Sequence, residues 1–119
     1  MTKGVLVVAH GSRARETEET LVSILEVVKE KMPTAIIEHA FMEFSDKTLE
    51  SGIASLVAKN VSEIKVVPYF LFAGIHLKED IPAMLNECVA KHRGIKWSME
   101  EPLGFDRRLA EILVDRISR

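Results

Sequence analysis

The fold is decided by residues 65–82, KVVPYFLFAGIHLKEDIP. The first half of this stretch is an apolar run rich in Val, Tyr and Phe, which is typical of a buried strand, and the run breaks at Ala73-Gly74. His76 follows the break and precedes a helix-like segment, so we expect this histidine at the mouth of a sheet. The stretch at residues 4–9, GVLVVA, has the same form and runs directly into His10. Two strands that each deliver a histidine indicate a shared site for a metal or a proton.

Strands and helices are expected to alternate along the chain. Strands are predicted over residues 4–9, 35–42, 63–71 and 95–99. Helices are predicted over residues 15–32, after a cap at Ser45-Asp46, from Ile81 to near His92, and after a cap at Asp106. The last helix is expected to turn its apolar positions inward: Leu109, Ile112, Leu113 and Ile117.

This alternation predicts an α/β fold with a four-stranded, mainly parallel sheet and flanking helices, as one domain over residues 1–119. Ligands of such sheets bind at the carboxyl ends of the strands. With the strand order 2-1-3-4, the first and third strands are neighbours. That order would bring His10 and His76 together.

Composition narrows the classes of function. The chain has 119 residues, 47% hydrophobic and 29% charged, with a formal net charge of -2, so nucleic-acid binding has no support from overall charge. A single cysteine, Cys88, excludes an intramolecular disulfide framework, and its helical position indicates a small core residue. No leader is recognised and no apolar run reaches the roughly 18 to 20 residues of a membrane span, so we expect a cytoplasmic protein without membrane contact.

Side chains at the predicted carboxyl edge suit a transition metal. His10, His76 and Glu43 supply two imidazoles and one carboxylate, a set that leaves coordination positions open for a substrate. The other two histidines have structural interpretations. His39 alternates along the second strand and is expected on a sheet face or rim, and His92 is expected in the last turn of a helix, where the dipole favours a cation.

Two further groups of residues indicate a ligand. Ser12, Arg13 and Arg15 follow His10 at a helix start, where basic side chains and free N–H groups attract carboxylates or phosphates, although ordinary capping explains them equally well. No GxGxxG or GxxxxGK[ST] motif is present, which disfavours classical nucleotide binding. Residues 72–75 place apolar surface past the strand end, where it could face a flat ligand or a partner subunit.

Three blocks of sequence resemble the small class II chelatases, the family of sirohydrochlorin cobaltochelatase and its nickel-inserting relatives. The blocks are HGSR at 10–13, AFMEFSDKTLE at 40–50 and VVPYFLFAGIHLKEDIP at 66–82. The resemblance implies insertion of Co²⁺, or alternatively Ni²⁺ or Fe²⁺, into sirohydrochlorin in cobalamin or related tetrapyrrole biosynthesis. The metal would be a substrate, with no permanently bound cofactor, and the enzyme would be a homodimer with a cleft between its halves.

The resemblance also implies roles for individual residues. His10 and His76 would hold the metal, His10 with Glu43 would handle protons, and Arg13 is a candidate for substrate carboxylates. Asp46 fills an acidic position that contacts substrate in the family, although Lys47 stands where the family commonly has Pro. The remaining substrate-lining positions would be Leu71, Phe72, Ala73, Gly74, Ile75 and His76.

Two alternative functions belong to other classes. A metal or tetrapyrrole carrier on the same fold would bind tightly without turnover. A histidine-dependent phosphatase would use His10 as nucleophile, but that chemistry normally has an arginine directly before the histidine, and here Ala9 precedes it.

Overall fold

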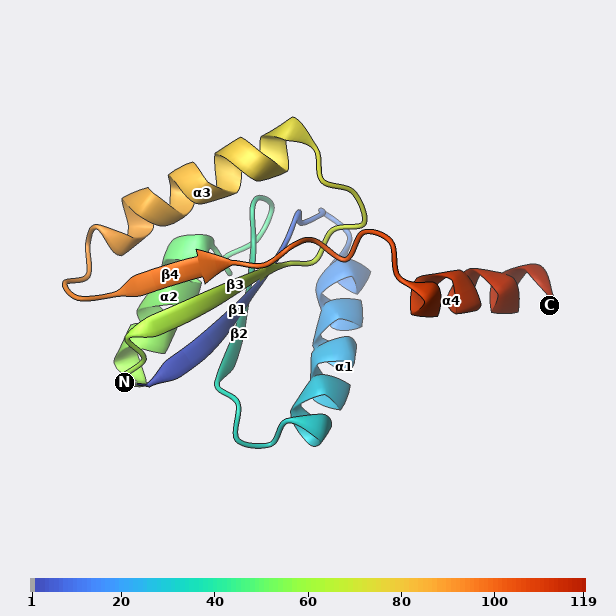
Figure 1. The fold of residues 1–119 in the computed structure, drawn as a ribbon, viewed down its shortest axis with the longest axis horizontal. Coiled ribbons are helices and arrows are strands. Elements are labelled where there is room, and N and C mark those ends of the chain that lie inside the picture. Colours follow the sequence, from blue (N-terminus) through green and yellow to red (C-terminus); the bar gives the residue numbers. More distant parts are fainter. Residues whose placement is uncertain (1) are drawn as a thin grey trace.

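The computed structural model describes residues 2–119, and for His76 it describes the backbone without the side chain. In this part of the chain four strands alternate with four helices (Figure 1). In chain order they are β1 Lys3–Ala9, α1 Arg15–Lys31, β2 Ile37–Phe41, α2 Leu49–Ala58, β3 Glu63–Pro68, α3 Ile75–Val89, β4 Lys96–Met99 and α4 Arg107–Ile117.

The sheet has the strand order β2-β1-β3-β4, and all three pairings are parallel, which confirms the predicted fold class and order. The register places Ala9 of β1 opposite Phe41 of β2, and Val8 opposite Pro68 of β3. The three neighbouring strands therefore end at nearly the same level. The loops that follow them meet at one carboxyl edge.

The two faces of the sheet are covered by different helices, because successive side chains of a strand point to opposite faces. Leu6 and Val8 of β1 pack with α2 and α3 in the larger core cluster. Val7 and Ala9 pack with Leu21 and Leu25 of α1 in the smaller one. Among the described residues, no helix is long and apolar enough to cross a membrane.

The third strand is shorter than predicted, because it ends at Pro68 rather than at Leu71. Tyr69 donates one further backbone hydrogen bond, from its N–H to the carbonyl of Val8 at 2.7 Å. Proline has no N–H to continue a ladder. Residues 70–74 then leave the sheet, so the apolar run of the sequence extends beyond the end of β3.

The second helix starts later than predicted, so the expected cap at Ser45-Asp46 is wrong. Thr48 is the N-cap, and its hydroxyl accepts the N–H of Ser51 at 3.1 Å. The hydroxyl of Ser45 accepts the N–H of Lys47 instead, at 3.0 Å, which stabilises a turn inside the loop. Residues 42–47 are therefore a loop rather than the beginning of α2.

The third helix covers residues 75–89, so it starts six residues before Ile81 and ends before His92. The expectation that His92 lies in the last helical turn is therefore wrong. Pro82 lies inside this helix.

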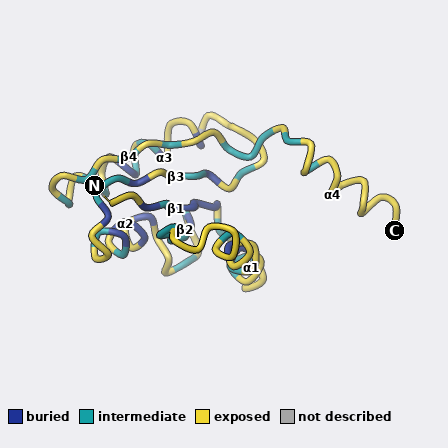
Figure 2. Tube along the Cα trace, turned by 60° about the horizontal axis from the view of Figure 1, so that its bottom comes forward, coloured by how far each residue is buried: buried dark blue, intermediate teal, exposed yellow. Residues whose placement is uncertain are grey.

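The last helix departs most from the prediction. Asp106 caps it as expected, accepting the N–H of Arg108 at 2.9 Å, but none of its 11 described residues is buried. Figures 1 and 2 show α4 extending beyond the carboxyl edge of the sheet, away from the other helices. The inward packing expected for Ile112, Leu113 and Ile117 is thus wrong. Periodicity indicates an apolar face but not what covers it.

Candidate functional site

His10 and Glu43 meet at the carboxyl edge of the sheet, as their strand-end positions predicted. His10 directly follows β1, and Glu43 follows β2 by two residues. The Nε2 atom of His10 lies 3.2 Å from Oε1 of Glu43. The backbones of the two loops are also joined, because the N–H of Glu43 donates to the carbonyl of His10 at 3.2 Å. The pair therefore rests on two neighbouring strands of the sheet.

The pair is open to solvent. The side chain of His10 is 63% exposed and that of Glu43 is 47% exposed. The ring of Phe70 lies edge-on to the His10 ring, with 6.5 Å between centroids. An exposed imidazole beside a carboxylate can exchange a proton with a bound molecule, and it can also offer one nitrogen to a metal that keeps other positions free.

His76 lies in the first turn of α3, at the same edge as His10, because α3 follows the segment that leaves β3. Its side chain is outside the described part of the structure, so its predicted role as a metal ligand remains a prediction. With that side chain set aside, residues 2–119 contain no group of three His, Cys, Asp or Glu side chains placed to hold a metal ion.

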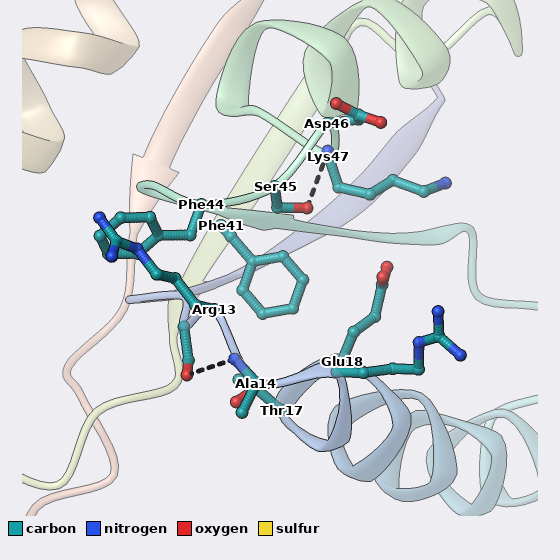
Figure 3. A pocket seen from close by; sticks show the side chains of 11 residues that line it. Arg13, Ala14, Thr17, Glu18, Phe41, Phe44, Ser45, Asp46 and Lys47 are labelled. Carbon is teal, nitrogen blue, oxygen red and sulfur yellow. Dashed lines mark hydrogen bonds between the residues drawn. The ribbon is translucent and has the colours of Figure 1, made fainter.

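Arg13 and Asp46 line one pocket between the start of α1 and the loop after β2 (Figure 3). The pocket has a volume of about 680 Å³ and is largely polar. The guanidinium of Arg13 lies over the ring of Phe44, 4.8 Å from its centroid. Arg15 and Lys47 add two further basic groups to the lining, while Asp46 and Glu18 add acidic ones.

Leu71, Phe72 and Ala73 line a different depression, which we call the α4 groove. Its other walls are Phe105 and the apolar positions of α4, including Leu109, Ile112 and Leu113. The groove is mostly apolar and has a volume of about 890 Å³. Phe72 is 82% exposed and Phe105 is 91% exposed, which is unusual for such large apolar side chains.

The predicted substrate residues are therefore divided between two places. Arg13 and Asp46 are in the polar pocket beside β2, whereas Leu71, Phe72 and Ala73 are in the α4 groove beyond β3. Gly74 caps α3 and Ile75 begins it, and both are exposed. Because β1 lies between β2 and β3 in the sheet, His10, which follows β1, lies between the polar pocket and the α4 groove. A broad ligand placed over His10 would reach toward both pockets.

The interpretations of His39 and Cys88 as residues outside the site agree with the structure. The Nε2 atom of His39 lies 2.9 Å from Oε2 of Glu18, so this histidine joins β2 to α1. Cys88 is half-buried beside the main core, and burial raises the pKa of its thiol, with a further contribution from the Glu50 carboxylate.

Phe44 and Phe105 line the two pockets, and sequence reasoning did not single them out. Phe44 supports Arg13 from a backbone in the left-handed region, with φ of 60°, and nothing in the residue type signals that conformation. Phe105 directly precedes the helix cap Asp106. The sequence did offer one signal, because Phe105 stands between Gly104 and the capping Asp106, where a large aromatic side chain is expected to be exposed.

Comparisons with known proteins agree with this architecture. The sirohydrochlorin cobaltochelatase of Sulfolobus acidocaldarius is 34% identical, over 98% of this chain and 90% of the relative. The sirohydrochlorin ferrochelatase of Priestia megaterium is 32% identical, but this chain covers only 43% of it. A solved structure, the sirohydrochlorin chelatase from Bacillus subtilis subspecies spizizenii in complex with cobalt, matches with a TM-score of 0.90 and 28% identity, over 99% of this chain and 50% of that one. The sequence profile of the CbiX family matches residues 4–119, and the chain therefore belongs to the CbiX family.

Proposed function

We propose that this chain is a chelatase that inserts a divalent metal, with Co²⁺ as the first candidate, into sirohydrochlorin. The observation that carries the proposal is the exposed His10–Glu43 pair, 3.2 Å apart at the carboxyl edge of the sheet. Relatives named for cobalt and for iron insertion into sirohydrochlorin support the substrate. The proposal treats residues 1–119 as one chelatase domain acting in the cytoplasm in cobalamin or related tetrapyrrole biosynthesis.

In the proposed reaction, the metal is a substrate, and no other cofactor is required. His10 and His76 hold the ion with few protein ligands, so it can be passed on. As the metal bonds to the pyrrole nitrogens, two N–H bonds of the ring break. His10 and Glu43 accept these protons and release them to water. An open site is an advantage here, because a complete cage of ligands would retain the metal.

The proposed binding surface for the ring combines the two pockets. The apolar segment formed by Leu71, Phe72, Ala73, Gly74 and Ile75 faces the flat ring beside His76. Arg13 binds peripheral carboxylates from the polar pocket, where Asp46 is a second contact. Guanidinium and carboxylate groups form strong charge-assisted hydrogen bonds, which suits a substrate with many carboxylates.

We also propose that the functional unit is a homodimer, in which a second copy packs on the exposed apolar face of α4, while residues 71–75 on the other side of the α4 groove still face the ring. Two observations support a second copy as the partner of this face. The α4 face carries exposed Ile112, Leu113 and Ile117, which a monomer would leave in water. This chain also covers only 50% of the cobalt-bound chelatase, so two copies would together approach the length of that relative.

The proposed activity is tested by an anaerobic absorbance assay. Sirohydrochlorin is offered Co²⁺, Ni²⁺ and Fe²⁺ separately, with and without the protein. We expect catalytic multiple turnover with Co²⁺ and measurable rates with Ni²⁺ or Fe²⁺, since imidazole sites do not by themselves select one of these ions. Tight binding of the ring or the metal without turnover would replace the proposal with a carrier function.

The role of His76 is tested in the same assay. His76→Ala should abolish metal insertion while the far-ultraviolet circular dichroism spectrum and the thermal midpoint stay close to those of the wild type. Full activity in this variant would contradict the assignment of His76 as a metal ligand.

A further inference from the structure

Gly11 lies where the loop after β1 passes the loop after β2. Its φ of +100° is in the region that glycine adopts freely and that other residues rarely adopt. A Cβ atom at this position would stand 2.1 Å from the carbonyl oxygen of Glu43 and 3.1 Å from its carbonyl carbon. Both are backbone atoms, so a rotamer change cannot relieve the contact. A side chain at position 11 would force the two loops apart.

Backbone hydrogen bonds hold the same two loops together. The N–H of Met42 donates to the carbonyl of Ala9 at 3.0 Å, and the N–H of Glu43 donates to the carbonyl of His10 at 3.2 Å. These bonds continue the pairing of β1 and β2 past the strand ends. The backbone of Glu43 is therefore fixed relative to that of His10, and Gly11 is what allows the approach.

We propose that Gly11 is a positioning residue for the His10–Glu43 pair. A new Cβ must retreat from 2.1 Å to at least 3.0 Å, a change of about 0.9 Å, before the contact becomes sterically acceptable. A displacement of this size directed along the His10–Glu43 contact would lengthen its 3.2 Å separation to about 4.1 Å, which is too long for a hydrogen bond. Gly11 thus acts through the spacing of two loops. The expected effect of Gly11 on catalysis rests on the proposed function, whereas its effect on the separation of His10 and Glu43 does not.

The kinetic test compares Gly11→Ala with Gly94→Ala. Gly94 also has a positive φ, of +80°, but a Cβ there meets nothing within 4 Å, so it reproduces the backbone penalty without the contact. For Gly11→Ala we expect kcat for cobalt insertion to fall by about 10- to 100-fold, because a misplacement near 1 Å can have an effect of that size. KM for sirohydrochlorin should change by less than about twofold. Gly94→Ala should retain wild-type kcat.

Non-additivity separates positioning from general damage. Glu43→Gln should lower kcat strongly in the wild-type background and add little in the Gly11→Ala background, where the pair is already separated. Full additivity of the two substitutions would overturn the proposal.

A spectroscopic readout needs neither metal nor tetrapyrrole, so it separates this proposal from the proposed function. At one fixed pH, Glu43→Gln should shift the ¹⁵N resonances of the His10 ring in the wild-type background and leave them unmoved in Gly11→Ala. A shift of equal size in both backgrounds would overturn the role of Gly11, whatever the chelatase assay shows. The wild-type chain could lack chelatase activity while the ¹⁵N shift caused by Glu43→Gln is still lost in Gly11→Ala. That result would support the role of Gly11 and contradict the proposed function.

A measurement on the wild type covers the case in which Gly11→Ala does not fold. The amide hydrogens of Met42 and Glu43 should exchange with solvent at least about tenfold more slowly than free loop amides, because both are hydrogen-bonded across the two loops. Exchange at the rate of a free loop would show that the loops are not held together and would overturn the proposal.

Discussion

The imidazole of His10 and the carboxylate of Glu43 lie 3.2 Å apart although 33 positions separate them in the sequence. Parallel pairing of β1 with β2 brings the two residues to the same edge. Removing either group should slow the proposed reaction at the proton-transfer step.

For this pair, we expect Glu43→Gln to lower kcat for metal insertion by about 100-fold, the usual range for loss of a proton acceptor, and His10→Ala to abolish insertion. The measurement is steady-state kinetics with sirohydrochlorin and Co²⁺. His92→Ala is the matched histidine control, because His92 lies between α3 and β4, away from the carboxyl edge. A loss of activity in His92→Ala equal to that in His10→Ala would contradict the assignment.

Arg13 should act in substrate binding rather than in chemistry. We expect Arg13→Gln to raise KM for sirohydrochlorin by about tenfold, which corresponds to about 1.4 kcal/mol, with little change in kcat. Phe44→Leu should have a smaller effect in the same direction, because it removes only the ring under the guanidinium. Arg93→Gln, an exposed arginine outside both pockets, is the control. A change in kcat alone would argue against a binding role for Arg13.

The exposed apolar face of α4 should govern association. Ile112→Asp places a carboxylate in the proposed interface, and we expect it to convert a dimer into a monomer in size-exclusion chromatography with light scattering. Val27→Asp changes an exposed aliphatic residue of α1 and should leave the dimer intact. A wild-type chain that stays monomeric at high concentration would rule out the second copy as the partner of this face.

Acid should loosen α4 before the sheet. The side chain and the backbone N–H of Arg108 both donate to Asp106, and they hold the pKa of this carboxyl well below its usual range. A carboxyl with a lowered folded-state pKa stabilises the fold above its unfolded pKa of about 4, and this contribution is lost as the pH falls below that value. We expect the protection factors of the α4 amides, taken relative to the intrinsic exchange rate at each pH, to fall between about pH 4 and pH 2, and Asp106→Asn to remove most of this pH dependence while keeping a capping oxygen.

The sheet was predictable because its determinants are local. Strand-helix alternation favours parallel pairing and right-handed crossovers, and polar residues directly after the strands indicate the candidate functional edge. The limits of the elements were less predictable. The apolar residues 69–71 resemble a strand, yet the pairing of β3 ends at Pro68. Ser45 and Thr48 are both good caps, and the choice between them depends on hydrogen bonds inside the loop.

The parts of the site that sequence could not predict depend on distant neighbours. The 3.2 Å contact of His10 with Glu43 requires Gly11 to lie against the backbone of Glu43, which no spacing along the chain reveals. The stacking of Arg13 on Phe44 depends on one residue with a positive φ. The apolar face of α4 was visible in the periodicity, but the sequence of one chain does not say that this face is left uncovered.

The early end of β3 at Pro68 has an evolutionary consequence. Residues 71–75 are exposed and lie outside the sheet, so substitutions there leave the strand pairing and the main core unchanged. His10 and Glu43 lie just after β1 and β2, in loops joined by backbone hydrogen bonds, and do not share this freedom. Selection can therefore reshape the surface proposed to face the ring while the His10–Glu43 pair stays in place. A lineage of such chains can diversify in substrate without rebuilding its scaffold.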